Sequence, residues 1–60
     1  MRVYVAIAEE DHGWDGSVRH VIGVYTSKEN VLERFKISPK YGKIGWEFDW
    51  EEFEVDDLTN

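Results

Sequence analysis

The chain has 60 residues, of which 42% are apolar and 15% aromatic, and this is enough for one small hydrophobic core. It has no cysteine, which excludes disulfide bridges, cysteine-ligated zinc and thiol nucleophiles, and it has no apolar run long enough to span a membrane. The net charge of −6 argues against nucleic acid or an anionic membrane as a direct partner. We therefore expect a single soluble domain over residues 1–60.

The first half of the sequence predicts two strands joined by a long loop. Residues 2–8 alternate with a period of two and are apolar on both faces, which is typical of a central strand. Residues 9–17 contain aspartates and glycines that favour turns, and Trp14 lies in this predicted hairpin loop. Residues 18–26 resume the period of two and predict the second strand.

A short helix is predicted next. Thr26 and Glu29 have the spacing of a capping box, in which two side chains satisfy free backbone N–H groups at a helix start. The helix is expected over residues 27–36, and Ser38-Pro39 ends it because the residue before a proline is disfavoured in the α region. Residues 40–45 contain two glycines and predict a turn.

The last segment, residues 46–55, predicts a third strand with an irregularity. Its apolar residues keep a period of two up to Trp50, but Phe53 and Val55 fall on the opposite parity. One extra residue at Glu51-Glu52 would form a β-bulge and return both side chains to the core face. The large aromatic residues of this strand are interpreted as core, namely Trp46, Phe48, Trp50 and Phe53.

Together these elements predict an α+β domain of order β-β-α-β, with a three-stranded antiparallel sheet and one helix packed on one face. Pairing of the last strand with the first gives the sheet order 2-1-3, and pairing of the last strand with the second is the alternative. Residues 57–60 are expected to form a frayed tail.

The sequence offers no catalytic constellation. The hydroxyl groups occupy predicted turn or cap positions, and His12 and His20 lack the partner spacing that nucleophilic catalysis needs. The acids of the first loop offer oxygen ligands, but their spacing matches no calcium loop. We therefore expect no enzymatic activity, no cofactor and no metal.

Negative charge is concentrated near the C-terminus. Residues 47–60 have a local charge of −7, whereas residues 1–46 have a local charge of +1. Such a run is often only a solvated face, but aromatic residues alternate with these acids, and that combination suits a basic partner surface. We predict that the uncovered sheet face binds the partner, with Tyr4 and Tyr25 at its centre and Trp14 reaching in from the loop. The acidic members of this predicted site are Glu47, Asp49, Glu51, Glu52, Glu54, Asp56 and Asp57.

Three stretches stand out together, namely Val3-Tyr4-Val5, the segment from Ile22 to Glu29, and Phe48-x-Trp50-x-x-Phe53-x-Val55-Asp56. They resemble a family of small domains of unknown function in bacteria, phages and prophages, in which a strand ending in Ile-Gly-Val-Tyr-Ser runs into a helix and an acidic last strand closes the fold. The resemblance implies the β-β-α-β fold and no activity. It also implies a phage accessory protein, cytoplasmic in its bacterial host, that binds and blocks a host protein.

Two functional hypotheses follow. The first is a non-enzymatic acidic protein that docks on the basic surface of a host protein, such as a nucleic-acid-binding protein or a defence nuclease, and inhibits it by DNA mimicry, like an anti-CRISPR protein. The alternative is a homodimeric structural or regulatory module that uses the open sheet face, with acids that only keep it soluble. Neutralisation of the acids by Arg19, Arg34 or the lysines would remove the basis of the first hypothesis.

Overall fold

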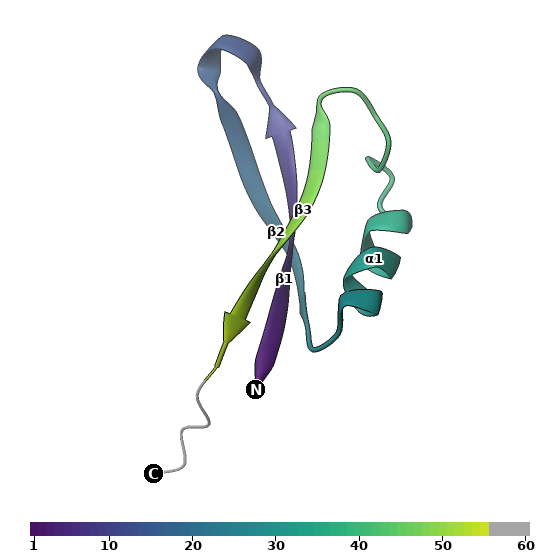
Figure 1. Cartoon of the computed structure of the whole chain (residues 1–60). Helices are drawn as coiled ribbons and strands as arrows, with labels where there is room; N and C mark the ends of the chain where they lie inside the picture. Colours follow the sequence, from purple (N-terminus) through teal and green to yellow (C-terminus); the bar gives the residue numbers. More distant parts are fainter. Residues whose placement is uncertain (56–60) are drawn as a thin grey trace.

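The computed structural model of the chain describes residues 1–55 and consists of a three-stranded antiparallel sheet with a helix on one face (Figure 1). The elements in chain order are β1 (Arg2–Asp11), the short 3-10 helix η1 (Gly13–Asp15), β2 (Ser17–Tyr25), α1 (Lys28–Lys36) and β3 (Trp46–Glu54). The sheet order β2-β1-β3 confirms the predicted α+β fold with the first strand in the centre. The predicted frayed tail at residues 57–60 lies outside the described residues.

Strand β3 pairs with β1 along its whole length without a register shift. The predicted bulge at Glu51-Glu52 is therefore wrong. A straight strand places Glu52 and Glu54 on the side of the sheet that carries α1, yet their side chains stay 40% and 62% exposed because α1 packs mainly against β1 and β2. Since neither carboxylate is buried, the strand needs no extra residue to turn them away from the core.

A bulge is present in β2 instead. The β1–β2 register shifts between Ala6 and Ile7, and Ile22 is the extra residue of β2 at that point. The Nε of Arg34 in α1 donates a hydrogen bond of 3.2 Å to the carbonyl oxygen of Ile22. The helix therefore supplies a partner for a backbone carbonyl at the irregular position.

The bulge decides which side chains of β2 face the helix. Beyond it, Gly23 is opposite Ala6 and Tyr25 is opposite Tyr4, so these residues lie on the helix side of the sheet. Val24 turns to the other side, where it is 58% exposed. Simple alternation from the start of the strand would instead place Val24 on the helix side and Tyr25 on the other side.

The core lies between α1 and the centre of the sheet. Ala6, Val31 and Phe35 are buried, with Phe35 the most exposed of them at 4%. The Phe35 ring meets the edge of the Phe48 ring at a centroid distance of 5.4 Å. Tyr4, Ile22 and Tyr25 are half-buried against this cluster. A helix of nine residues thus completes the core on one face of the sheet only.

The start of α1 is capped one residue later than predicted. The Ser27 Oγ accepts a hydrogen bond of 3.3 Å from the backbone N–H of Asn30, and Ser27 has extended backbone angles. Thr26, the predicted cap, does not fill this position. The helix begins at Lys28 and ends at Lys36, which agrees with the predicted range to within one residue.

The Tyr25 ring lies across Gly23, and this contact leads to a test. A Cβ atom at residue 23 would lie 2.5 Å from the Cε2 and Oη atoms of Tyr25. We expect Gly23→Ala to lower the free energy of unfolding by about 1–3 kcal/mol, because the half-buried ring must leave its packing position. Urea unfolding measures this change. In a Tyr25→Ala background the same substitution should cost nothing, and an equal cost in both backgrounds would contradict the assignment.

Candidate functional site

The face of the sheet opposite α1 is uncovered in the described part of the chain (Figure 1). Residues directly opposite each other in neighbouring strands point to the same side, so the register identifies its members. We call this surface the open face. It contains Val3, Val5, Ile7, Glu9, Asp11, Arg19, Val21, Val24, Glu47, Asp49, Glu51 and Phe53.

The two tyrosines predicted at the centre of the binding surface are not on the open face. Tyr4 and Tyr25 are opposite each other in the β1–β2 pair, and both pack against the core under α1. The bulge at Ile22, which simple alternation does not reveal, accounts for Tyr25. Tyr4 is in β1, which pairs with β3 without a shift, so its placement depended only on which of the two apolar faces of residues 2–8 the helix covers. Val21, which is 67% exposed, does lie on the open face and is one of its apolar members.

The acids of β3 divide between the two faces. Glu47, Asp49 and Glu51 are on the open face, whereas Glu52 and Glu54 are on the helix side. Asp56 and Asp57 lie outside the described residues. Of the acids predicted for the binding surface that the structure describes, these three are on the open face.

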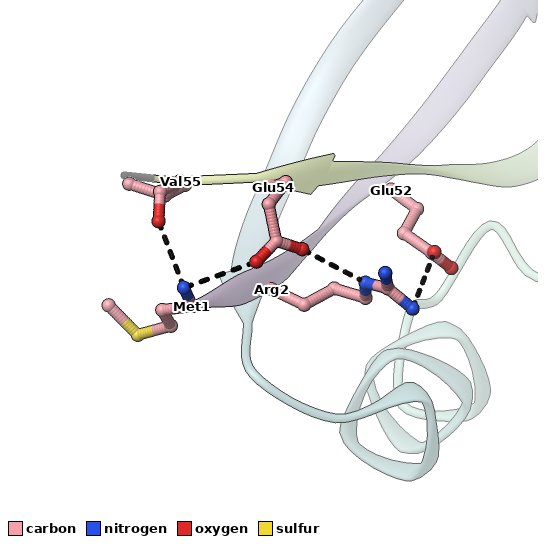
Figure 2. A network of polar contacts seen from close by, with 5 residues as sticks. All are labelled: Met1, Arg2, Glu52, Glu54 and Val55. Atoms are coloured by element: carbon pink, nitrogen blue, oxygen red, sulfur yellow. Dashed lines mark hydrogen bonds and ion pairs between the residues drawn. The ribbon is translucent and has the colours of Figure 1, made fainter. Parts of the chain in front are cut away.

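Three of these acids have cationic partners within the chain. Figure 2 shows that Arg2 lies between Glu52 and Glu54, with Nη1 3.2 Å from the first carboxylate and Nε 3.4 Å from the second. The N-terminal amine of Met1 is 3.4 Å from Glu54 and donates to the Val55 carbonyl at 2.9 Å. Glu52 first, and Glu54 next, raise the pKa of the Arg2 guanidinium above its ordinary value. This end of β3 is thus largely neutralised.

Arg19 neutralises part of the open face. Its Nη2 is 3.2 Å from a Glu51 carboxylate oxygen, and its Nε is 3.8 Å from Glu9. Arg34 instead binds the carbonyl of Ile22 and takes no part in the acidic strand. The neutralisation that would weaken the basic-partner hypothesis therefore occurs at Glu51, Glu52 and Glu54.

Several acids at the other end of the sheet have no cationic partner in the described part of the chain. Within residues 1–55, Asp11, Glu47 and Asp49 form no ion pair. Asp11 accepts a hydrogen bond of 2.8 Å from the Gly13 N–H, and Asp49 accepts one of 2.8 Å from the Trp50 N–H. The charges of Asp11 and Asp49 are partly stabilised by these backbone N–H groups, and none of the three charges is neutralised.

These acids line two adjoining hollows on the open face. The larger hollow, about 370 Å³, is bordered by Ile7, Glu9, Arg19, Glu47, Phe48 and Asp49. The second, about 310 Å³, is bordered by Glu9, Asp11, Gly13, Gly16, Ser17 and Glu47. Glu9 and Glu47 belong to both hollows and are opposite each other in the β1–β3 pair. The hollows therefore form one concave acidic area.

Two fully exposed apolar side chains stand at the same end of the molecule. Trp14 is in η1 at the tip of the β1–β2 hairpin, where positive φ angles at Gly13 and Gly16 allow the tight turn. Ile44 is in the α1–β3 connection, which is tied to the hairpin by a 2.8 Å hydrogen bond from the Asp11 N–H to the Gly45 carbonyl. We call this region the acidic end; it comprises Glu9, Asp11, Trp14, Ile44, Glu47 and Asp49.

The two histidines both lie beside Glu10. His12 Nε2 is 2.9 Å from a Glu10 carboxylate oxygen, and His20 Nε2 is 3.9 Å from the same oxygen. The His20 ring stacks on Trp46 at a centroid distance of 6.0 Å. Over the described residues, no group of three or more histidine, aspartate or glutamate side chains is arranged to hold a metal ion.

None of the protein-family models, curated proteins or solved structures compared with this chain matches it. The resemblance to small phage and bacterial domains therefore stays a prediction. No helix in residues 1–55 has the length and apolar character that crossing a bilayer requires.

Proposed function

We propose that the protein is a non-enzymatic binding module whose acidic end docks on a basic surface of a partner protein. The observation that carries this proposal is the set of unneutralised carboxylates, Asp11, Glu47 and Asp49, beside a fully exposed tryptophan. Exposed tryptophan is uncommon on a surface without a partner and is among the residues that contribute most to protein interfaces.

Charge and shape support a protein partner over a small molecule. The acidic area is concave but wide open, and its carboxylates attract cations from a distance and disfavour neutral or anionic partners. Trp14 and Ile44 add apolar surface that becomes favourable once a partner excludes water from it. Arginine-rich surfaces fit this combination, because guanidinium groups bind carboxylates and stack on aromatic rings.

In its most specific form, the proposal is that the partner is a nucleic-acid-binding protein or a defence nuclease. The working surface of such a protein is basic because it binds phosphate. Docking of the acidic end there would occupy the nucleic-acid site and inhibit the partner. Inhibition by charge mimicry in this form needs only the acids of one end of the sheet.

Removal of the unpaired charges tests the proposal. We expect Glu47→Gln combined with Asp49→Asn to weaken partner binding by about tenfold or more, because two carboxylates that meet cations are lost. The measurement is capture of bacterial lysate proteins on the immobilised chain, followed by the affinity of the purified partner. The captured protein should be basic, and its capture should fall in high salt.

A matched variant separates local from overall charge. Glu29→Gln combined with Glu33→Gln makes the same change in net charge on α1, and we expect it to leave binding within twofold of the wild type. Equal weakening by both pairs would mean that only net charge matters. Capture of acidic or neutral proteins alone would contradict the proposal.

A further inference from the structure

The open face has two halves along the strands. One half belongs to the acidic end, with Glu9, Glu47 and Asp49. The other half is apolar; Val3, Val5, Val24 and Phe53 form it, and Val21 lies at its border, level with Asp49 because both are opposite Ile7. In this half Val21, Val24 and Phe53 are 67%, 58% and 47% exposed, although only five apolar side chains among residues 1–55 are buried, and one of these, Ile7, is itself on the open face. The Arg19–Glu51 ion pair crosses the border between the halves, since Glu51 is opposite Val5 and Arg19 is opposite Glu9.

The apolar half is hollowed rather than flat. Val5, Ile7, Val21 and Phe53 line a depression of about 360 Å³, with the Arg19–Glu51 pair at its rim. This depression shares Ile7 and Arg19 with the larger acidic hollow, so the two form one continuous surface. A partner that fills the surface must therefore bring apolar side chains to one half and cations to the other.

The width of the open face matches one helix. The sheet has three strands spaced about 4.8 Å apart, so its outer strands are about 10 Å apart. A helix with its side chains is about 10–12 Å in diameter. On the opposite face, α1 already packs on the sheet in this manner (Figure 1). A second helix on the open face would enclose the sheet between two helical layers.

Charge argues for a basic helix and against a second copy of the chain. Two copies each bring a net charge of −6, and face-to-face packing would bring the unpaired Glu47 and Asp49 of both near each other or bury them. A segment with lysines or arginines at one end gives these carboxylates partners. The apolar half would be covered by the remainder of the same segment.

The spacing of the two halves sets the sequence pattern of the partner. Along β3, Phe53 is four residues from Asp49 and six from Glu47, which corresponds to about 13 and 20 Å at 3.3 Å per residue. A helix rises 1.5 Å per residue, so these spans equal about 9 and 13 helical residues. The cations should therefore follow or precede the anchor over Phe53 by about 9 to 13 positions, and the anchor over Val21, which is level with Asp49, by fewer.

We propose that the open face binds an amphipathic α-helix of the partner, with apolar side chains over Val21, Val24 and Phe53 and lysines or arginines at Glu47 and Asp49. This inference rests on the proposed function and specifies the element of the partner that is bound. The partner helix carries an apolar stripe at positions i, i+3, i+4 and i+7 that begins over Phe53, and its basic residues lie two and a half to three and a half turns from the start of this stripe.

A synthetic peptide is the probe. It has 20 residues, with leucines in an i, i+3, i+4, i+7 stripe and three arginines 9 to 13 positions from the first leucine. The control peptide has the same composition, but its arginines are interspersed within the leucine stripe. We expect the first peptide to shift the backbone amide NMR signals of β2 and β3 residues on the open face, and to bind at least tenfold more tightly than the control.

Two variants of the chain locate the contact. Val21→Thr combined with Val24→Thr keeps the shape and strand propensity and should weaken binding of the first peptide by about tenfold, since buried apolar groups are replaced by hydroxyls. Leu32→Gln, an exposed position on α1, should leave binding unchanged. Signal shifts confined to α1, or equal affinity for the two peptides, would overturn the inference.

Self-association is a separate outcome that would also overturn it. Open-face signals that shift with protein concentration in the absence of peptide, more strongly at high salt, would show that a second copy occupies the face. The proposed function is tested separately by the Glu47→Gln, Asp49→Asn pair in partner capture. If that pair loses capture while Val21→Thr, Val24→Thr retains it, the basic-partner proposal stands and the helix assignment fails.

Discussion

Replacement of Phe35 by alanine should leave most of the protein unfolded at 25 °C. The Phe35 ring is 4% exposed and packs against the rings of Phe48 and Tyr41, at centroid distances of 5.4 and 6.3 Å. Truncation of a buried phenylalanine typically costs about 3–5 kcal/mol through lost burial and the cavity that remains. A core of this size rarely supplies more than about 3–5 kcal/mol of net stability in total. The loss of this one ring would therefore remove most or all of the free energy of unfolding.

A neighbouring helix position provides the control. Leu32 is on the same helix but 47% exposed, and we expect Leu32→Ala to change the free energy of unfolding by about 1 kcal/mol or less. Urea unfolding followed by far-ultraviolet circular dichroism measures both variants. A Phe35→Ala variant with a transition midpoint close to that of the wild type would show that the core is held by other contacts.

Loss of the Trp14 side chain should abolish most partner binding without affecting the fold. The ring is fully exposed at the hairpin tip and contacts no core residue, so Trp14→Ala is expected to change stability by less than about 0.5 kcal/mol. As a desolvated anchor in an interface, a tryptophan typically contributes about 2 kcal/mol or more, which is about thirtyfold in affinity. Calorimetric titration with the captured partner measures the loss.

Another exposed apolar residue tests whether the effect is specific to the acidic end. Ile37, 73% exposed, follows α1 and borders a hollow with Tyr25 and Asn30 rather than the acidic end. Ile37→Ala should bind as the wild type does. If Ile37→Ala and Trp14→Ala weaken binding equally, the hairpin tip has no special role.

The order of the elements could be predicted because the signals are local. Alternation marked the strands, glycines and aspartates marked the hairpin, and the apolar character of residues 2–8 on both faces placed them at the centre of the sheet. The bulge could not be placed in the same way. The change of spacing before Phe53 suggested an extra residue in β3. No such residue is needed, because the sheet face opposite α1 is uncovered and Phe53 can stay on it, 47% exposed.

The bulge at Ile22 left no sign in the pattern of β2, because both faces of that strand carry apolar residues. Its consequence was the wrong face for Tyr25; Tyr4 was placed wrongly because both faces of residues 2–8 are apolar and the pattern does not show which one the helix covers. A hint was available in Gly23, since a glycine inside a strand often marks a bulge or a close approach of another group. Here the group is the Tyr25 ring.

The partners of the acids also depended on the register. Counting charge by segment gave β3 a large negative total, but cross-strand pairing puts Arg2 opposite Glu54 and brings Arg19 within reach of Glu51. The predicted order, with the first strand beside the last in antiparallel orientation, was enough to suggest the Arg2 pairing. Ile44 was missed because an isolated apolar residue among glycines and lysines carries no periodic signal.

The salt dependence of partner affinity is the most direct test of the central claim that unneutralised carboxylates at the acidic end drive binding. Affinity for the captured basic partner should be measured between 50 and 500 mM salt, values chosen so that the screening length falls from about 14 to about 4 Å. We expect a steep fall for the wild type and a clearly shallower one for Glu47→Gln, Asp49→Asn. An affinity that does not change with salt, or a slope that the two substitutions leave intact, would contradict this claim.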